Sequence, residues 1–180
     1  KERGFTVETT KKWGLGYSPE SWEALAGHSK AKGFNAEVMV LAGLLKLRDN
    51  GTHYDLFRHR VMFSIYSVTG KVIAFAGRKM SSTDPSPKYV NSPETDLYKK
   101  SDVLFGLFQA KNSIKKADKV YMTEGYTDVI TLSQAGIENV VASSGTALTP
   151  GQIKLLKRFT DNVTVVYDGD AAGIKASLRG

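Results

Sequence analysis

The C-terminal third of the chain alternates short apolar, β-branched runs with longer stretches whose pattern suits helices. The runs that predict strands are 119–123, 139–142 and 163–167, and the stretches that predict helices are 126–135, 149–158 and 171–179. Gly136 suits the end of the first helix, and Thr149 before Pro150 suits the start of the second. Strands that alternate with helices in this way indicate a parallel sheet flanked by helices.

The N-terminal part mixes helical and strand-like patterns. Helices are expected at 6–12, 19–32 and 36–47, strands at 61–66 and 71–77, and a joining helix at 104–116. Pro19 after Ser18 predicts the start of the second helix, while Asn35 and Asn50-Gly51 predict the two ends of the third. The two strands are separated by a short polar segment and should form a hairpin. The whole pattern predicts the α/β class, with an α+β lobe followed by the parallel sheet.

Two acidic motifs follow predicted strands directly. Glu124-Gly125-Tyr126-Thr127-Asp128 comes after 119–123, and Asp168-Gly169-Asp170 comes after 163–167. Right-handed crossovers would bring the carboxyl ends of these parallel strands to one edge of the sheet, where open α/β sheets bind ligands. Carboxylates that converge there repel one another unless a cation neutralises them, and oxygen ligands favour a hard ion. The sequence therefore predicts a magnesium site.

Simpler interpretations of these acidic residues stay open. The segment from Asp168 to Gly173 also fits an ordinary turn that caps the next helix, because Asp and Gly are turn residues. Asp128 can cap or brace the helix that begins after Gly125, instead of binding an ion. Glu124 can take part in proton transfer, and the sequence does not separate that role from metal ligation.

The formal net charge of +7 is concentrated in one part of the chain. Residues 58–100 contain eight Lys or Arg against three Asp or Glu, a net of +5, whereas 1–57 and 101–180 carry +1 each. A surface of this kind attracts a polyanion. Aromatic residues lie between these charges and could stack on bases. Phe63 and Phe75 are nevertheless expected to be core residues, because they occur in apolar or alternating runs.

Longer sequence motifs resemble known families. The segments EGYTDVI at 124–130, ASSGTAL at 142–148 and VVYDGDAAG at 165–173 resemble the Toprim domain of primases, topoisomerases and some nucleases. The segments that resemble bacterial replicative primases of the DnaG type are GFTVETTKKWGLGYSPESWEAL at 4–25, FRHRVMFSI at 57–65, GKVIAFAGRKM at 70–80 and PKYVNSPET at 87–95. The resemblance implies a basic N-terminal lobe at 1–116 and a Toprim domain at 117–180.

This resemblance implies a DNA-directed RNA polymerase that joins ribonucleoside triphosphates into short RNA primers on single-stranded DNA. It implies catalysis by Glu124, Asp168 and Asp170, with Mg²⁺, or Mn²⁺ as a substitute, held by these residues and Asp128. Binding of nucleotide and template is implied for six residues: Arg58, Arg60, Arg78, Lys88, Asn91 and Lys100. The implied protein partners are the replicative helicase and the single-stranded DNA-binding protein, through parts of the parent outside this chain.

The chain departs from the family pattern in two respects. The family carries a further Asp-x-Asp motif after the DGD segment, so the Toprim domain is expected to be incomplete and the fragment weakly active or inactive by itself. A zinc module is not expected, since the chain has no cysteine and its three histidines show no ligand spacing. No apolar stretch approaches the roughly 20 residues that cross a bilayer, and a cytoplasmic place in the replisome follows mainly from the family.

Two other functions are alternatives to primer synthesis. A topoisomerase or nuclease could use the same carboxylates, although the primase-like segments between 57 and 95 argue against both. A topoisomerase would also need a tyrosine nucleophile elsewhere. The isolated fragment could instead be a non-catalytic module that binds single-stranded nucleic acid. Neither a P-loop nor a His-Glu-x-x-His motif is present.

Overall fold

The computed structural model describes residues 4–143 and 148–166. The predictions for Asp168, Asp170 and the helix at 171–179 lie outside the described residues. The chain divides into two compact units. The first unit contains the residues up to Trp13, Ile65–Val72 and those from Lys99 onward; the second contains Gly14–Ser64 and Ile73–Tyr98. The predicted domain division between 116 and 117 stays a prediction.

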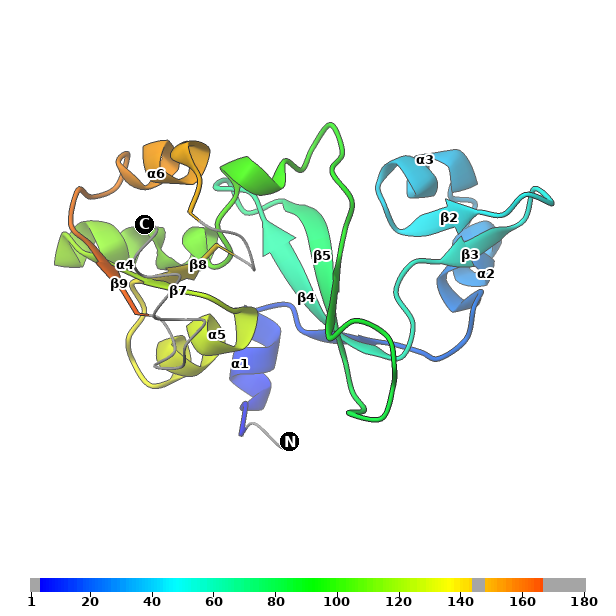
Figure 1. Ribbon diagram of the computed structural model, residues 1–180, viewed down its shortest axis with the longest axis horizontal. Coiled ribbons are helices and arrows are strands. Elements are labelled where there is room, and N and C mark those ends of the chain that lie inside the picture. Colours follow the sequence, from blue (N-terminus) through cyan, green and yellow to red (C-terminus); the bar gives the residue numbers. More distant parts are fainter. Residues whose placement is uncertain (1–3, 144–147, 167–180) are drawn as a thin grey trace. The chain divides into compact units, whose positions relative to one another are not determined.

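The first unit is built on a parallel sheet (Figure 1). Among the described residues, its strands lie in the order β8 (Val140–Ala142), β7 (Val120–Thr123) and β9 (Val163–Val165), and both pairings are parallel. The helical elements of this unit are α1 (Val7–Lys12), the 3₁₀ helix η1 (Lys100–Asp102), α4 (Leu107–Ala117), α5 (Tyr126–Gln134) and α6 (Pro150–Leu156). The α/β class with a helix-flanked parallel sheet is thereby confirmed.

Helices cover both faces of this sheet (Figure 1). On one face, apolar side chains from α4 and α6 pack on the strands, and the buried members of this core are Leu104, Leu107, Ala110, Ile114, Val120, Met122, Val141 and Leu156. On the other face, Val129 and Ile130 of α5 are fully buried. Each such side chain contributes roughly 1.5–3 kcal/mol when it leaves water, so the helices are essential to the stability of a sheet this small.

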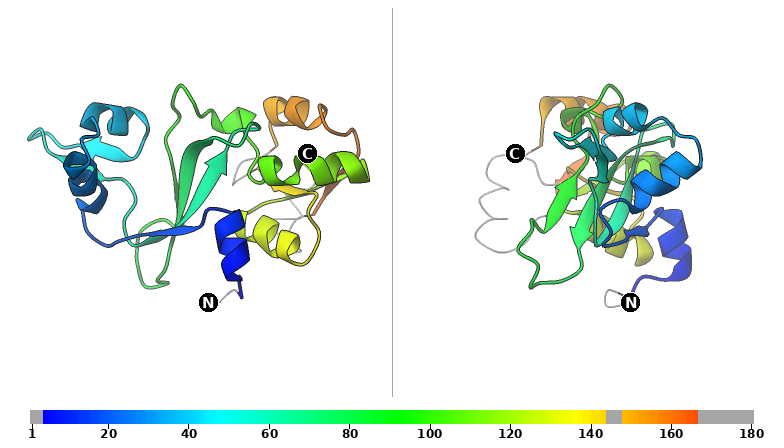
Figure 2. Two further views of the ribbon diagram at one scale, coloured as in Figure 1. Left: turned by 180° about the vertical axis from the view of Figure 1, so that it is seen from behind. Right: turned by 90° about the vertical axis from the view of Figure 1, so that its right-hand side faces the viewer.

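The N-terminal helix α1 packs beside α5 in the same unit (Figure 2). Thr6 caps it, as its hydroxyl oxygen accepts a hydrogen bond from the Thr9 backbone N–H at 3.1 Å. Gln134 of α5 accepts a hydrogen bond from the Thr6 N–H at 3.1 Å. Trp13, which is 1% exposed, stacks on Phe105 with ring centroids 5.3 Å apart. Helix α1 and Trp13 are therefore part of the unit that contains the parallel sheet.

The second unit contains the antiparallel pairings. One sheet has the order β1 (Gly16–Ser18), β4 (Arg60–Tyr66), β5 (Val72–Lys79) and β6 (Tyr89–Asn91), and the tip of the β4–β5 hairpin belongs to the first unit. A smaller sheet pairs β2 (Leu45–Leu47) with β3 (His53–Asp55). Helices α2 (Ala24–Ala31) and α3 (Ala36–Leu41) complete the unit. In the described part of the chain, no helix is long and apolar enough to cross a membrane.

The predicted helix at 19–32 is wrong at its start, since α2 begins at Ala24. Ser18 instead ends strand β1, where it pairs with Arg60. The α2 N-terminus is capped from a distance: the Asp55 carboxylate accepts hydrogen bonds from the Leu25 and Ala26 backbone N–H groups at 2.7 and 2.9 Å. The cap from Asp55 takes the place of the helix start that was predicted at Ser18 and Pro19.

The predicted helix at 36–47 is wrong at its end. Asn35 is the N-cap, as expected, but α3 stops at Leu41 and Gly43 adopts a φ of +67°. Leu45 then enters strand β2 and is buried. Asn50-Gly51 lies in the turn between β2 and β3, where the Arg48 N–H donates to the Thr52 carbonyl at 2.8 Å. Apolar spacing alone did not reveal this hairpin.

Candidate functional site

Glu124 occupies the carboxyl end of the central parallel strand β7. Thr123, the last residue of β7, pairs with Ala142 of β8, and its hydroxyl donates to the Val141 carbonyl at 3.2 Å. Glu124 follows directly and precedes Gly125, the N-cap of α5. The residue is half-buried, and its Oε1 atom is buried from solvent. A strand end tied to its neighbour thus holds the carboxylate at the sheet edge, as predicted.

Asp128 lies in the first turn of α5 and is exposed. Its Oδ2 atom lies 2.8 Å from the position that a Cβ atom would take on Gly125. The carboxylate therefore returns towards the turn that contains Glu124, and a larger residue at position 125 would displace it. A negative charge at this place also favours the helix N-terminus, so the geometry fits both of the roles considered for Asp128.

Strand β9 runs beside β7 towards the same edge. Met122 pairs with Val165, and the Val166 N–H donates to the Met122 carbonyl at 2.8 Å. Asp168 comes two residues after Val166 in the sequence, and neither Asp168 nor Asp170 belongs to the described residues. The carboxyl ends of β7 and β9 therefore lie at one edge of the sheet, and the convergence of the two acidic motifs there stays a prediction.

The donor set at this edge suits a hard divalent ion. Glu124 and Asp128 offer oxygen ligands only, and magnesium in proteins takes one or two carboxylates and keeps several waters. Within 4–143 and 148–166, no group of three or more His, Cys, Asp or Glu side chains comes together as a metal site. The residues present fit the two-carboxylate part of a magnesium site, and the other predicted ligands lie outside the described range.

Arg58 belongs to the second unit and stands over an aromatic pair. Its guanidinium carbon lies 3.7 Å from the centre of the Trp22 ring and 5.7 Å from that of Tyr54. The guanidinium also donates to the Asp55 backbone carbonyl. Arg48 approaches the same two rings, at 5.7 and 5.0 Å. Cation–π contacts of this kind hold the arginines at the surface without removing their charge.

Trp22 and Tyr54 were not singled out from the sequence. They line an open cavity of about 690 Å³ together with Lys46, Arg58 and His59. Trp22 is 54% exposed, which is unusual for so large a ring. A weak signal existed, since Tyr54 lies just before Arg58, the first residue of the basic segment 58–100, but only the fold brings Trp22 to the same cavity.

Arg60 differs from Arg58 because it is 5% exposed and its guanidinium is bound internally. Its Nη1 donates to the backbone carbonyls of Gly77 and Pro87 at 3.1 and 3.0 Å. Its Nη2 donates to the Ser86 hydroxyl at 2.7 Å. Burial lowers the pKa of Arg60 from its ordinary value, and nearby Asp84 acts in the opposite direction. Its predicted role in binding nucleotide or template stays a prediction.

The other predicted binding residues occupy more open positions. Arg78 is half-buried on β5, and its buried Nε–H finds no acceptor among the described residues. Lys88 is exposed just before β6, and Asn91 lies half-buried at the end of that strand. Lys100 begins η1 in the first unit, where its carbonyl accepts from Gln152 Nε2 at 3.2 Å. Lys88 is thus open to a ligand, whereas the Nε–H of Arg78 is buried from solvent.

The aromatic residues between these charges are mostly internal. Phe63 is 2% exposed, which confirms its prediction as a core residue, whereas Phe75 is only half-buried. Phe57 and Tyr98 are also buried. The side chains available for stacking are therefore found elsewhere, above all at Trp22.

Comparisons with known families cover nearly the whole chain. The family described as the DNA primase catalytic core, N-terminal domain, matches residues 1–111, and the Toprim domain family matches residues 118–180. A DNA primase of Clostridium acetobutylicum is 47% identical over 180 residues, and one of Pseudomonas aeruginosa is 43% identical. These alignments cover 99% of this chain, but 29% and 27% of the two relatives.

Solved structures give the same result. The RNA polymerase domain of the Mycobacterium tuberculosis primase DnaG aligns with a TM-score of 0.91 at 38% identity, covering 99% of this chain and 60% of that one. The E. coli primase catalytic core aligns with a TM-score of 0.87 at 41% identity, covering 99% and 56%. A DnaG primase catalytic domain bound to single-stranded DNA aligns with a TM-score of 0.85 at 40% identity, covering 99% and 57%.

Proposed function

The chain belongs to the DnaG-type bacterial DNA primases, and we propose that it is the part of a primase catalytic core that carries the first acidic motif and the nucleic-acid-binding basic residues. The proposed reaction joins ribonucleotides on a single-stranded DNA template by attack of a 3′-hydroxyl on an α-phosphate, with release of pyrophosphate. The supporting observation is the place of Glu124 at the carboxyl end of β7, beside β9.

The acidic residues would hold the divalent ion. We propose that Glu124, Asp168 and Asp170 are its ligands and that Asp128 supports them. When bound, such an ion lowers the pKa of an attacking hydroxyl and neutralises charge on phosphorus oxygens. The half-buried position of Glu124 suits this role, because partial exclusion of water strengthens its attraction for a cation. Magnesium is the proposed ion because the described donors are oxygens only.

The basic residues would bind phosphates. Arg78 is half-buried on β5, and Arg58 keeps its charge beside the exposed Trp22 ring. Arginine forms paired hydrogen bonds with phosphate, whereas Lys88 and Lys100 supply mobile point charges. Trp22 offers a face for base stacking. Asn91 completes the proposed set. A related catalytic domain bound to single-stranded DNA supports the choice of ligand.

Primer synthesis by the complete protein tests the catalytic assignment. Glu124→Gln and Asp168→Asn each keep side-chain size while removing a charge, and each should abolish ribonucleotide incorporation on a single-stranded template. Glu37→Gln, at an exposed position in α3, is the matched control and should leave incorporation unchanged. Normal synthesis by the Glu124 and Asp168 variants would show that catalysis does not need these two carboxylates.

A crystal soaked in manganese tests the ion site directly. Anomalous density beside Glu124 would support the proposed site, and density elsewhere with none at Glu124 would contradict it. Contacts with the replicative helicase and the single-stranded DNA-binding protein, and a cytoplasmic place in the replisome, belong to the same proposal. They rest on family membership alone.

A further inference from the structure

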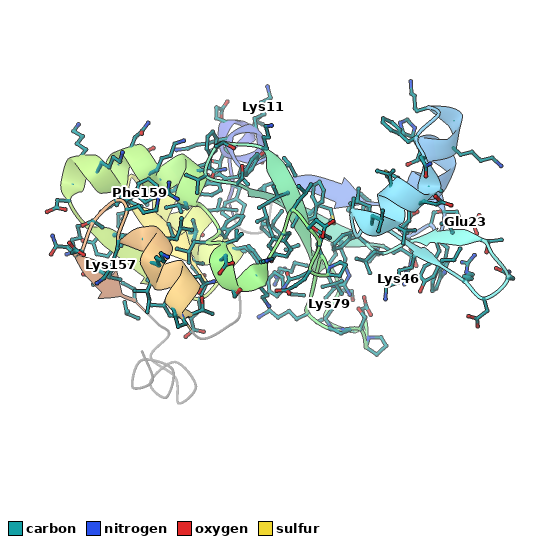
Figure 3. The ribbon with its side chains drawn as sticks, turned by 90° about the horizontal axis from the view of Figure 1, so that it is seen from above. Lys11, Glu23, Lys46, Lys79, Lys157 and Phe159 are labelled. Atoms are coloured by element: carbon teal, nitrogen blue, oxygen red, sulfur yellow. The ribbon has the colours of Figure 1, made fainter. Side chains whose placement is uncertain are left out.

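The loop between β5 and β6, residues 80–88, is held to the sheet by two cationic side chains. Figure 3 shows one of them, Lys79, near the end of β5. Its ammonium group donates to the Asp84 carbonyl and, at 2.9 Å, to the Ser86 carbonyl. The other is Arg60, which reaches the Pro87 carbonyl and the Ser86 hydroxyl from β4. We call these contacts the loop clamp.

Within the loop, Asp84 and Ser86 form the part that the clamp holds. The Ser86 N–H donates to Asp84 Oδ1 at 2.8 Å. The backbone and side-chain hydrogen bonds from Ser86 lower the pKa of Asp84 from its ordinary value, and the charges of Lys79 and Arg60 act in the same direction. The loop thus presents an ionised carboxylate to the two cations that bind its carbonyls.

Room for Arg60 is made by a glycine on the neighbouring strand. A Cβ atom on Gly77 would lie 2.9 Å from Arg60 Cδ and 2.9 Å from Phe57 Cδ1. Gly77 therefore lets the Arg60 side chain pass over β5 to the loop. The Gly77 carbonyl, in turn, accepts a hydrogen bond from Arg60 Nη1.

These contacts are costly to replace with a phosphate contact. Hydrogen bonds that involve a charged group are stronger than neutral ones, and Arg60 makes bonds to Gly77, Pro87 and Ser86. A nucleic acid would have to break some of them to reach this guanidinium, which is 5% exposed as a residue. Lys88, at the end of the same loop, is exposed and needs no such exchange.

We propose that Arg60 and Lys79 are positioning residues that fix the loop at 80–88, so that Lys88 is presented to a nucleic-acid phosphate. The backbone supports this link, since the Lys79 N–H donates to the Lys88 carbonyl at 3.0 Å and Arg78 pairs with Tyr89. The clamp thus holds the two residues that directly precede Lys88, Ser86 and Pro87. This inference rests on the proposed function only for the identity of the ligand.

Binding of single-stranded DNA to the chain over a series of salt concentrations tests the inference. The variants are Ser86→Ala, Arg60→Lys, Lys88→Ala and the two double variants that combine a clamp change with Lys88→Ala. Lys88→Ala should weaken binding and reduce the salt slope by roughly 0.7, the value for one phosphate contact on a single strand. Ser86 lies in a loop and its replacement by alanine changes no charge. The Ser86→Ala variant therefore still tests the clamp if the Arg60→Lys variant does not fold.

The expected result is coupling between the clamp and Lys88. Ser86→Ala and Arg60→Lys should each weaken binding about 2- to 10-fold in the wild-type background, but less than about 2-fold when Lys88 is already alanine. Hydrogen exchange of the amides in 80–88 should become faster in both clamp variants, while the thermal midpoint of the chain stays close to that of the wild type for Ser86→Ala.

Additive effects would overturn the inference, because they would show that the clamp does not act through Lys88. Unchanged binding or unchanged exchange of the loop amides in both clamp variants would also overturn it. Failure of the proposed function has a different signature: Lys88→Ala, Arg58→Gln and Arg78→Gln would then all bind DNA like the wild type, whatever the exchange of the loop.

Discussion

The guanidinium carbon of Arg58 lies 3.7 Å from the centre of the Trp22 ring. Charge and aromatic surface thus meet in one cavity, although 36 positions of sequence (58 − 22) separate the two residues. Proteins that bind single strands without reading their sequence combine these two features, since phosphates follow the charge and bases stack on the rings. Replacing Trp22 and replacing Arg58 should therefore change DNA binding in different ways.

Replacing Trp22 with alanine should weaken binding of single-stranded DNA and leave its salt dependence nearly unchanged. Loss of one stacking platform costs about 1–3 kcal/mol, which corresponds to roughly 5- to 150-fold in affinity. Arg58→Gln should instead lower the salt slope by roughly 0.7, because it removes a charge. Fluorescence anisotropy over a salt series measures both quantities.

The matched control is Phe34→Ala, at an aromatic residue with a similar exposed fraction, 62% against 54% for Trp22. This control should bind like the wild type. Equal losses in the Phe34 and Trp22 variants would show that the cavity at Trp22 is not the binding surface.

Gly77→Ala should destabilise the chain by about 1–3 kcal/mol, the usual range when a methyl group is forced into a packed site. The added atom would meet Arg60 and Phe57, as described above. Gly27→Ala is the control, because no atom lies within 4 Å of its would-be Cβ and the residue is in helix α2. That control should be neutral or stabilising by up to about 1 kcal/mol. Urea unfolding of both variants measures the difference, and equal midpoints would contradict the prediction.

Asp128→Asn should weaken Mn²⁺ binding, though less than Glu124→Gln does. Gly125→Ala should act in the same direction as Asp128→Asn, since its Cβ would displace Asp128 Oδ2 from a distance of 2.8 Å. Electron paramagnetic resonance of free Mn²⁺ gives the affinities. If Asp128→Asn lowers stability by about 0.3–1 kcal/mol and leaves Mn²⁺ affinity unchanged, the residue only braces the helix N-terminus.

The pH dependence of stability should include a contribution from the ion pair between Lys12 and Glu138. Their charged atoms lie 2.8 Å apart, and the hydrogen bond from Lys12, helped by its charge, lowers the pKa of Glu138 from its ordinary value. A carboxylate whose pKa is lower in the folded state stabilises that state above its unfolded pKa. This contribution disappears as the pH falls through the folded pKa.

Lys12→Met should therefore lower the free energy of unfolding at neutral pH by no more than about 1 kcal/mol, because both side chains are largely exposed. The difference from the wild type should shrink as the pH falls through the lowered folded pKa of Glu138 and vanish once Glu138 is protonated in both proteins. Lys11→Met, one residue earlier on α1, is the control. A difference that persists unchanged at the lowest pH would contradict the assignment.

Local signals predicted much of the fold. Thr149, Pro150 and Gln152 begin α6 with a complete capping box, so neighbouring residues suffice to define that helix start. The strands β7 and β8 were likewise found, because buried parallel strands are continuous apolar segments, and β9 was found from its β-branched residues although Val163 and Val165 are exposed. The place of Glu124 at a strand end followed from the same pattern.

Long-range contacts explain what the sequence did not reveal. The start of α2 depends on Asp55, about 30 positions away, and β1 exists because it pairs with β4. The internal bonds of Arg60 likewise come from a loop that begins 20 positions later. From sequence, Arg58 and Arg60 look equivalent, yet Arg58 lies against the exposed Trp22 ring, whereas Arg60 is 5% exposed and donates to backbone carbonyls.

Helix α4 crosses the interval between the two family matches, which end at residue 111 and begin at residue 118. The side chains that seal one face of the parallel sheet, including Leu107 and Ile114, therefore precede the Toprim match. A chimaera joined at residue 118 would inherit its catalytic strands from one parent and their apolar cover from another. A chimaera joined before Leu104, with α1 taken from the same parent as the parallel sheet, would keep the strands and the helices that pack on them from one protein.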